Sequence, residues 1–366
     1  MSFSDFYGNA ELVRQLRESV AHGRVPQSMI LAGPKGAGKY TLALMLARAV
    51  NCLTPRESDG LPDYCGHCRN CEQIGVAEKL DELAAAAVEA REELREADKK
   101  ETRILIQTHP DILIVPPDPP QMLIKIGQVK HVIHAAYYRP PIEAKRAFSI
   151  FTSSAFMKEA ANSLLKVLEE PPERATIILL TENPQELLPT IRSRALTYRL
   201  GALPVAELEG LIAERKPEIG ARERALVARL ANGAVGRALH FDLDSYLSSR
   251  QDALVLIRSA LREPDYTALF KTTESYKAGA EGQEKMVNLL RALNSLLEDL
   301  LLILAGVGGQ IRNIDLNNEL AKLADGVTLE WIEGAARAAA QAEQGMRRNL
   351  LRSLSIDAMT AAMSMN

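Results

Sequence analysis

Long apolar runs, a strong net charge and an abundance of aromatic residues are all missing from this sequence of 366 residues. Apolar runs such as 300–306 are too short to span a membrane, and residues 1–12 lack the basic and then apolar layout of a secretory signal. A net charge of -3 excludes a basic field over the whole chain, so any contact with DNA must come from a local patch or from partner chains. With 47% hydrophobic and 5% aromatic residues the chain can still bury a sizeable core. We expect a cytoplasmic protein of two or three domains without membrane contact.

Cysteine is absent outside one short segment, since all four cysteines lie between residues 52 and 71. In a chain without a secretion signal, such clustering favours metal binding over disulfides. The spacing is C-x12-C-x2-C-x2-C, and tight C-x2-C turns present two thiolates to one tetrahedral zinc. We predict a closed, structural Zn²⁺ site; reduced thiols or a disulfide are the alternative, and His67 fits an outer position better than a ligand position. The predicted ligands are Cys52, Cys65, Cys68 and Cys71.

A glycine-rich stretch near the N-terminus has the pattern of a phosphate-binding loop. Residues 28–33 (SMILAG) are expected to form a short buried strand, and an apolar-periodic helix is expected from the loop to residue 50. Between them, glycines would let backbone N–H groups approach phosphate oxygens, and a lysine would reach the outer phosphates. The candidate phosphate-binding residues are Gly33, Gly36, Gly38 and Lys39.

The small hydroxyl that such a loop needs after its lysine is missing. The position is Tyr40, a phenol at the end of a rigid ring, where a serine or threonine would ligate magnesium. Thr41 does not replace it, because a residue one step further along a helix points about 100° away.

The acidic residues of an ATPase are missing too. An enzyme of this type needs an Asp for magnesium, and usually a Glu to activate water, at the end of a core strand. Between Pro141 and Lys158 the only acid is Glu143, which precedes the best candidate strand, and the strand ends in Thr152 and Ser153. Loss of a general base alone costs about 10²- to 10⁴-fold in rate. We therefore expect no intrinsic ATPase activity and weak or absent binding of ATP or ADP.

Short apolar runs separated by helical patterns predict an α/β fold with a mostly parallel, five-stranded sheet and helices on both faces. The runs are 28–33, 111–115, 147–151, 176–181 and 195–200. Between residues 76 and 101, apolar residues are spaced alternately four and three apart. We favour a surface helix or hairpin arm packed on its own domain, with a partner-binding coiled coil as the alternative. After residue 203, helical patterns continue almost to the end.

Several segments together resemble a known family. FSDFYGNAELVRQLRESVAHGRVPQSMILAGPKGAGK, THPDILIV, LIKIGQVK, ANSLLKVLEEPP and PTIRSRALTYRL are similar to the clamp-loader AAA+ proteins of bacteria. The similarity is greatest to the delta-prime type of the DNA polymerase III holoenzyme, and it covers almost the full length. In the family's ATP-hydrolysing members an Asp-Glu pair and a short variable stretch precede ANALLKTLEEPP. This sequence keeps the segment and lacks the acids.

The resemblance implies three domains. An AAA+ nucleotide-binding-like domain would occupy residues 1–203, with the zinc module at 52–71 and a helical insertion at 76–101. A small helical lid would follow at 204–247, and an all-α collar domain for oligomerisation at 248–366.

The family's arginine finger lies in a Ser-Arg-Cys motif, which Ser193 and Arg194 match here with Ala195 in place of the cysteine. Carried over, Arg194 would enter the ATP site of a neighbouring subunit and stabilise charge on the transferring phosphate. Such a residue can be worth about 10³ to 10⁵ in turnover. Arg192 is the nearest competitor for this role, and a surface ion pair is the alternative role of Arg194.

Two nucleotide sensors of the family match this sequence poorly. Thr181 and Asn183 fall where a polar sensor would follow the fourth strand, and a capping role fits them equally. The second sensor, an arginine, falls on Gly236. Arg237 beside it would point about 100° away on a helix.

The resemblance thus implies a non-hydrolysing clamp-loader subunit that helps load a sliding clamp on primed DNA. Its expected partners are tau or gamma and delta subunits in a hetero-pentameric ring, the sliding clamp and primer-template DNA. Two alternatives stay open: an active AAA+ ATPase subunit like tau or gamma, and a zinc-containing interaction protein outside replication. No other cluster of reactive residues stands out, and Glu169 and Glu170 end a helix without a partner that the sequence identifies.

Overall fold

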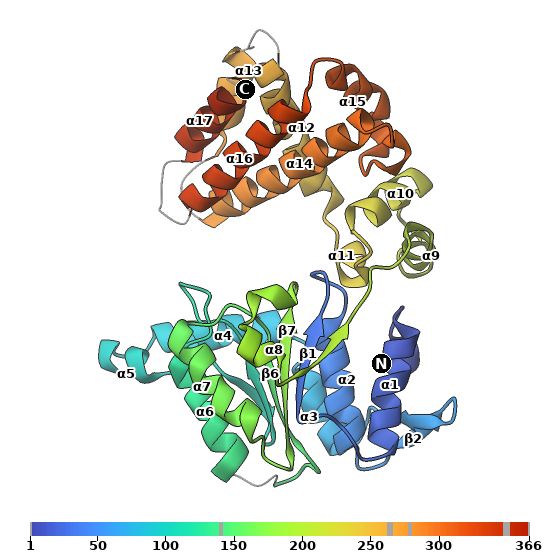
Figure 1. The fold of residues 1–366 in the computed structure, drawn as a ribbon, viewed down its shortest axis with the longest axis vertical. Helices are drawn as coiled ribbons and strands as arrows, with labels where there is room; N and C mark the ends of the chain where they lie inside the picture. The colour runs from blue at the N-terminus through green and yellow to red at the C-terminus, as the bar shows by residue number, and fades with distance from the viewer. Residues whose placement is uncertain (1, 139–141, 262–265, 277–279, 347–351, 365–366) are drawn as a thin grey trace. The chain divides into compact units, whose positions relative to one another are not determined.

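The computed structural model describes residues 2–138, 142–261, 266–276, 280–346 and 352–364 (Figure 1). The chain divides into two compact units. The N-terminal unit comprises Met1–Pro204 and Gly233–Arg237, and the C-terminal unit comprises Val205–Asn232 and Ala238–Asn366. Each unit has a hydrophobic core of its own.

A six-stranded sheet forms the centre of the N-terminal unit. The strand order is β4-β5-β6-β7-β1-β8; β4 is antiparallel to β5, and the other neighbours are parallel. The strands are β1 (Ser28–Ala32), β4 (Ile106–His109), β5 (Ile112–Val115), β6 (Ala147–Phe151), β7 (Ala175–Thr181) and β8 (Leu196–Arg199). This topology confirms the α/β class with a mostly parallel sheet.

Helices cover both faces of the sheet, because successive strand residues point to opposite sides (Figure 1). The buried side chains of Leu31 and Ile178 belong to the core on one face, and those of Ile30 and Leu179 to the core on the other. The first face packs against α1 (Ala10–Ala21), α2 (Lys39–Asn51) and α3 (Arg69–Val76). The second packs against α6 (Ile126–Tyr138), α7 (Lys158–Glu169) and α8 (Pro189–Arg192).

The sequence predicted five strands, but the sheet has six. The additional strand, β4, has the sequence IQTH, so no apolar run marks it. A small separate hairpin joins β2 (Arg56–Ser58) to β3 (Leu61–Asp63) within the cysteine segment. Two short 3-10 turns, η1 (Phe3–Asp5) and η2 (Pro184–Glu186), complete the unit.

The segment between residues 76 and 101 forms two short helices, α4 (Leu80–Glu92) and α5 (Glu96–Glu101). The side chains of α4 that pack against the core of the unit are Leu80, Leu83 and Ala84. Near the end of α4, Arg91 is buried and lies 2.7 Å from the buried carboxylate of Asp118. Helix α4 therefore packs on its own unit, in agreement with the prediction of a surface helix packed on its own domain.

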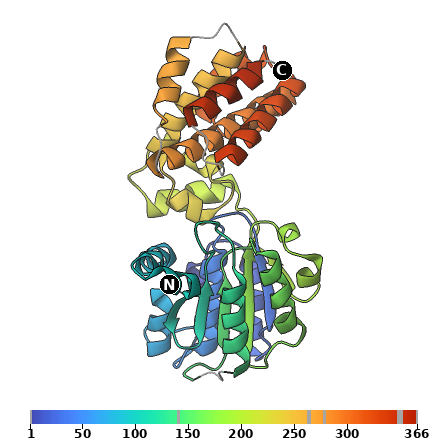
Figure 2. The ribbon, with the colours of Figure 1, turned by 90° about the vertical axis from the view of Figure 1, so that its left-hand side faces the viewer.

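Among its described residues, the C-terminal unit contains helices joined by loops and no strand (Figure 2). Its helices are α9 (Val205–Arg215), α10 (Ala221–Leu230), α12 (Leu243–Leu261), α13 (Tyr266–Glu274), α14 (Ala280–Leu304), α15 (Asn317–Ala324), α16 (Leu329–Met346) and α17 (Arg352–Ser364), with the turns η3 (Gly308–Gln310) and η4 (Ile314–Leu316). Leu293, Leu296 and Leu300 of α14, at helical spacing, are fully buried in its core. None of the described helices has the length and apolar character to cross a membrane.

The predicted lid (204–247) and collar (248–366) both lie mainly in this unit. Short helix α11 (Val235–Leu239) begins in the N-terminal unit and ends in the C-terminal one. The boundary between lid and collar stays a prediction.

Candidate functional site

The predicted phosphate loop lies between the carboxyl end of β1 and the start of α2. Gly36 and Gly38 have left-handed backbones, with φ of +82° and +86°. A Cβ on Gly36 would lie 2.8 Å from the backbone nitrogen of Arg237, and one on Gly38 would lie 2.8 Å from a ring carbon of Phe6. The strand, loop and helix of a phosphate site are therefore present, and the fold requires these glycines for its own packing.

Lys39 is turned back onto its own loop. Its Nζ donates to the carbonyl oxygens of Gly33, at 2.7 Å, and Pro34, at 2.8 Å. Burial lowers the pKa of Lys39, and the carboxylate of Glu182, directly after β7, acts against that shift. To reach a phosphate, the ammonium group would have to exchange these two main-chain acceptors.

The segment that should carry the second sensor lies against the loop. The backbone N–H of Gly236 donates to the carbonyl oxygen of Gly36 at 2.8 Å. Because Gly236 has no side chain, this position contributes a main-chain contact and no cationic group.

Tyr40 gives its hydroxyl to the cysteine segment and not to the loop. The hydroxyl donates to the carbonyl oxygen of Ala77, the residue that caps α3, at 2.7 Å. Burial raises the pKa of Tyr40, so the phenol stays a neutral donor. The position at which a magnesium ligand is expected thus serves packing between α2 and α3.

Polar residues at the ends of β6 and β7 bond to nearby backbone. The Oγ of Ser153 accepts a hydrogen bond from the N–H of Ala155 at 3.0 Å. Thr181 Oγ1 donates to the carbonyl of Asn183 at 2.9 Å, and Asn183 Oδ1 accepts from the N–H of Gln185 at 3.0 Å. Both sensor candidates therefore make the capping contacts that were their alternative role.

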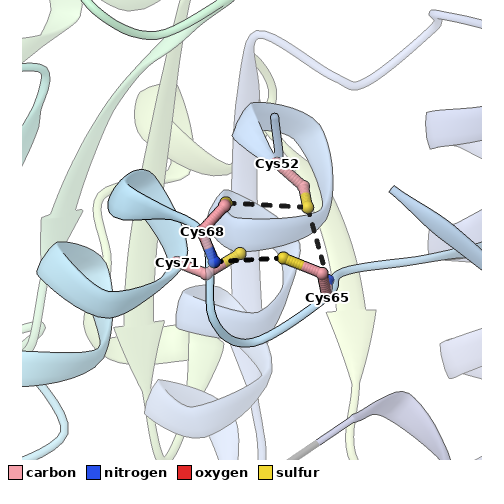
Figure 3. A group of neighbouring side chains, drawn as sticks. All are labelled: Cys52, Cys65, Cys68 and Cys71. Carbon is pink, nitrogen blue, oxygen red and sulfur yellow. Dashed lines mark hydrogen bonds between the residues drawn. The ribbon is translucent and has the colours of Figure 1, made fainter. Parts of the chain in front are cut away.

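The four cysteine thiols converge on one point at the other end of α2 (Figure 3). Cys52 caps the end of α2, Cys65 follows the β2-β3 hairpin, and Cys68 and Cys71 lie at the start of α3. All four sulfur atoms lie within 4.8 Å of one another, and those of Cys52 and Cys68 are 3.9 Å apart. Four Zn–S bonds of about 2.3 Å in a tetrahedron place the sulfur atoms about 3.8 Å apart, so the cluster has the dimensions of a zinc site.

Backbone N–H groups point at the sulfur atoms. The N–H of Cys65 donates to the Sγ of Cys52 at 3.3 Å, and that of Cys68 donates to the Sγ of Cys65 at 3.2 Å. Although burial acts against it, hydrogen bonds from Thr54 and from the backbone of His67 and Cys68 lower the pKa of Cys65 to about 5. N–H···S contacts of this kind orient and stabilise thiolate ligands.

His67 does not belong to the cysteine cluster, and Arg48 connects the cluster to α2. The ring of His67 is exposed, with Nδ1 3.0 Å from the carbonyl oxygen of Cys65. Arg48 of α2 is buried; its Nε donates to the carbonyl of Cys71 at 3.2 Å, and its Nη1 lies 2.6 Å from the Glu78 carboxylate. The group that could hold a metal ion thus consists of the four cysteine thiols.

Arg194, the predicted arginine finger, lies just beyond α8. Its Nη1 donates to the carbonyl oxygen of Thr190 at 3.0 Å and to the Oγ of Ser193 at 3.2 Å. Its Nη2 lies 2.9 Å from the Oε1 of Glu169, and 35% of its side chain is exposed. The guanidinium is thus held at the surface by contacts that leave part of it open to a second molecule.

Arg192, the other candidate for the arginine finger, is held more closely by its own unit than Arg194 is. Its Nη1 donates to the Oε1 of Gln185 at 2.6 Å, and its Nε is buried without a hydrogen-bond partner among the residues of known placement. Of the two arginines in this turn, Arg194 is the one more accessible to a neighbouring chain.

Comparison with known proteins decides the family. A family model described as "DNA polymerase III, delta subunit" matches residues 8–204, which is more than half of the chain. The chain belongs to this DNA polymerase III subunit family. The matched region contains the loop, the cysteine cluster and Arg194.

Relatives of two subunit types are similar to this DNA polymerase III family member. The delta-prime subunit of Bacillus subtilis is 27% identical over 246 residues, which is 67% of this chain and 63% of that protein. The tau subunit of Escherichia coli is 26% identical over 242 residues, which is 65% of this chain and 32% of tau. The alignments thus span less than two thirds of either relative, and identity alone does not separate the two types.

Solved structures align with this family member at lower similarity. The DNA polymerase III gamma subunit-related protein of Thermotoga maritima is 16% identical with a TM-score of 0.41, over 96% of this chain and 99% of that one. The RuvB Holliday junction branch migration motor of the same organism is 15% identical with a TM-score of 0.39, over 82% of this chain and 78% of that one.

Two contacts of the site were missed from the sequence. Glu169 has a partner after all, Arg194, and Tyr40 has one in Ala77. In both pairs the residues are far apart in the sequence and meet only when separate helices and loops pack. No local pattern in this single sequence marks either contact.

Proposed function

We propose that this chain is a non-hydrolysing clamp-loader subunit of the delta-prime type, which supplies Arg194 to the ATP site of a neighbouring subunit. Membership of the DNA polymerase III subunit family supports a place in that assembly. The proposed partners are tau or gamma and delta subunits in a hetero-pentameric ring, the sliding clamp and primer-template DNA. The proposed location is the cytoplasm.

The observation that carries the proposal is the state of the chain's own loop. Lys39 donates to loop carbonyls, and Tyr40 donates to Ala77. The segment directly after β6, which β7 separates from β1 in the sheet, holds Thr152 and Ser153. Magnesium and an attacking water would therefore meet none of the side chains that normally hold and activate them, so ATP or ADP would bind weakly or not at all.

Arg194 supplies the chemistry that the chain can still give. A guanidinium placed against the transferring phosphate of a neighbour stabilises the charge that develops in the transition state. Partial exposure beyond the end of a short helix suits a group that must reach another chain. Ser193 keeps the guanidinium at this turn through its hydroxyl.

Zinc would have a structural role in this subunit. Cys52, Cys65, Cys68 and Cys71 would hold it as four thiolates. Such a set leaves no open position for a substrate, so a bound zinc cross-links α2, α3 and the loop between them and takes no part in turnover.

The test is ATP turnover in a complex reconstituted with tau or gamma, delta, the clamp and primed DNA. We expect the isolated chain to show no ATP turnover. In the complex, Arg194→Ala should lower ATP turnover at the neighbouring site by at least about 10³-fold. Arg192→Ala is the matched control and should leave that site close to wild type. Turnover by the isolated chain, or equal turnover with the two arginine variants, would contradict the proposal.

A further inference from the structure

We propose that Glu169 is a positioning residue for Arg194: it holds the guanidinium within its own chain and competes for it with the phosphate of the neighbouring subunit. This inference rests on the proposed function of Arg194 as a group given in trans. It adds a second residue to that site and sets when the arginine is available.

The position of Glu169 at the end of a helix favours a cation beside its carboxylate. Glu169 is the last residue of α7, and Glu170 follows as its cap. Helix C-termini carry a partial negative charge, so two adjacent carboxylates at this point repel it and each other. The Nη2 of Arg194, 2.9 Å from the Oε1 of Glu169, supplies the compensating positive charge.

The same pair interferes with binding of a phosphate. An arginine that already neutralises a carboxylate presents little net charge to a second anion. A phosphate within hydrogen-bond distance of Arg194 would also approach Glu169, and like charges repel. Full engagement therefore requires that the guanidinium leave Glu169.

The contact is weak enough for this exchange. The side chains are 35% exposed for Arg194 and 51% exposed for Glu169. An exposed ion pair shifts the equilibrium between its paired and unpaired states by a factor of only about two to five. The hydrogen bonds to Thr190 and Ser193 do not involve Glu169, so they keep the guanidinium at this turn after the ion pair breaks.

The experiment measures kcat and KM for ATP in the reconstituted complex, first without and then with clamp and primed DNA. Glu169→Gln keeps the shape of the side chain and removes its charge. We expect kcat without clamp and DNA to rise about two- to fivefold, with an unchanged KM, because the finger acts in the transition state. The rise should be smaller with clamp and DNA, when the neighbour's phosphate already holds the arginine.

Two controls separate this role from a structural or general electrostatic one. Glu170→Gln removes the same charge one residue away and should leave kcat unchanged. The double variant Glu169→Gln/Arg194→Ala should match Arg194→Ala alone, because Glu169 acts only through the arginine. Melting of the isolated Glu169→Gln chain should stay within a few degrees of wild type.

The outcomes distinguish the two proposals. If Arg194→Ala slows the complex but Glu169→Gln leaves kcat unchanged or lowers it, the role of Glu169 is overturned and the finger stands. A rise that Glu170→Gln reproduces, or that persists in the Arg194→Ala background, also overturns it. If Arg194→Ala has no effect, the proposed function itself fails, and Glu169 has nothing to position.

Discussion

The two ends of α2 differ in what they retain. At its start, Gly38 and the rest of the loop keep the backbone of a phosphate site, while Lys39 and Tyr40 are committed to other contacts. At its end, Cys52 joins three other cysteines in a set with the dimensions of a zinc site. One end has the shape without the side-chain chemistry, and the other has the side chains in place. On the proposed function, loop shape and reactivity are separate properties of this chain, and its function follows reactivity.

The two ends are also connected. Tyr40 donates to the cap of α3, and Arg48 donates to the carbonyl of Cys71 within α3. Both residues lie on α2 and face the same neighbouring helix. The contrast between the ends can be tested by changing one residue at each end and one residue that links them.

The largest effect is expected at the cysteine end. Loss of a residue that only contacts a metal ligand lowers metal affinity roughly 10- to 100-fold. Cys71→Ser removes a ligand itself, so it should lower zinc affinity by more than this. It should also lower the melting temperature of the N-terminal unit. Metal analysis after competition with a chelator measures the first, and calorimetry the second. His67→Ala, beside the cluster, should retain about one zinc per chain. If wild type and Cys71→Ser retained the same amount of zinc per chain, the cysteine end would not act as a zinc site. The two ends of α2 would then no longer differ in function.

An intermediate effect is expected for the linking residue. Tyr40→Phe leaves the buried carbonyl of Ala77 without its donor, which costs about 1–3 kcal/mol. The melting temperature of the unit should fall by about 2–10 °C, and amide exchange in α3 should become faster. Tyr137→Phe is the control, because that exposed hydroxyl also donates to a backbone carbonyl, where water can replace it. An unchanged melting temperature in Tyr40→Phe would mean that the two ends are independent.

The smallest effect is expected at the loop end. Lys39→Ala removes the residue on which an active phosphate loop depends, yet turnover of the reconstituted complex should change by less than about twofold. Its comparison with Arg194→Ala in the same assay places the contribution of this chain either in its own loop or in its neighbour's site. A loss of turnover comparable to that of Arg194→Ala would restore a working loop and contradict the proposed subunit type.

Much of the site could be predicted from the sequence because its parts are local. The loop follows a strand and precedes a helix within a few residues, and the C-x2-C spacing by itself brings thiolates together. In the same way, the apolar runs identified the five strands of the central sheet other than β4. Each of these features depends on neighbours in the chain.

What could not be predicted depends on contacts between distant segments. β4 has one apolar residue at its start and exists because it pairs with β5 at the sheet edge. Tyr40 and Ala77 meet across two helices, and the ion pair of Glu169 with Arg194 joins the end of α7 to the turn after α8. Packing decides these contacts, and composition and periodicity carry no signal for them.

The crowded surroundings of Gly36 have a consequence for how such sequences change over time. A side chain at this position would meet the backbone of Arg237, whether or not a nucleotide ever binds. The glycine would then be retained by selection for folding after selection for ATP hydrolysis has ended. If the proposed function holds, a glycine pattern can outlast its chemistry, and a survey that counts ATPases by that pattern alone would count this chain wrongly.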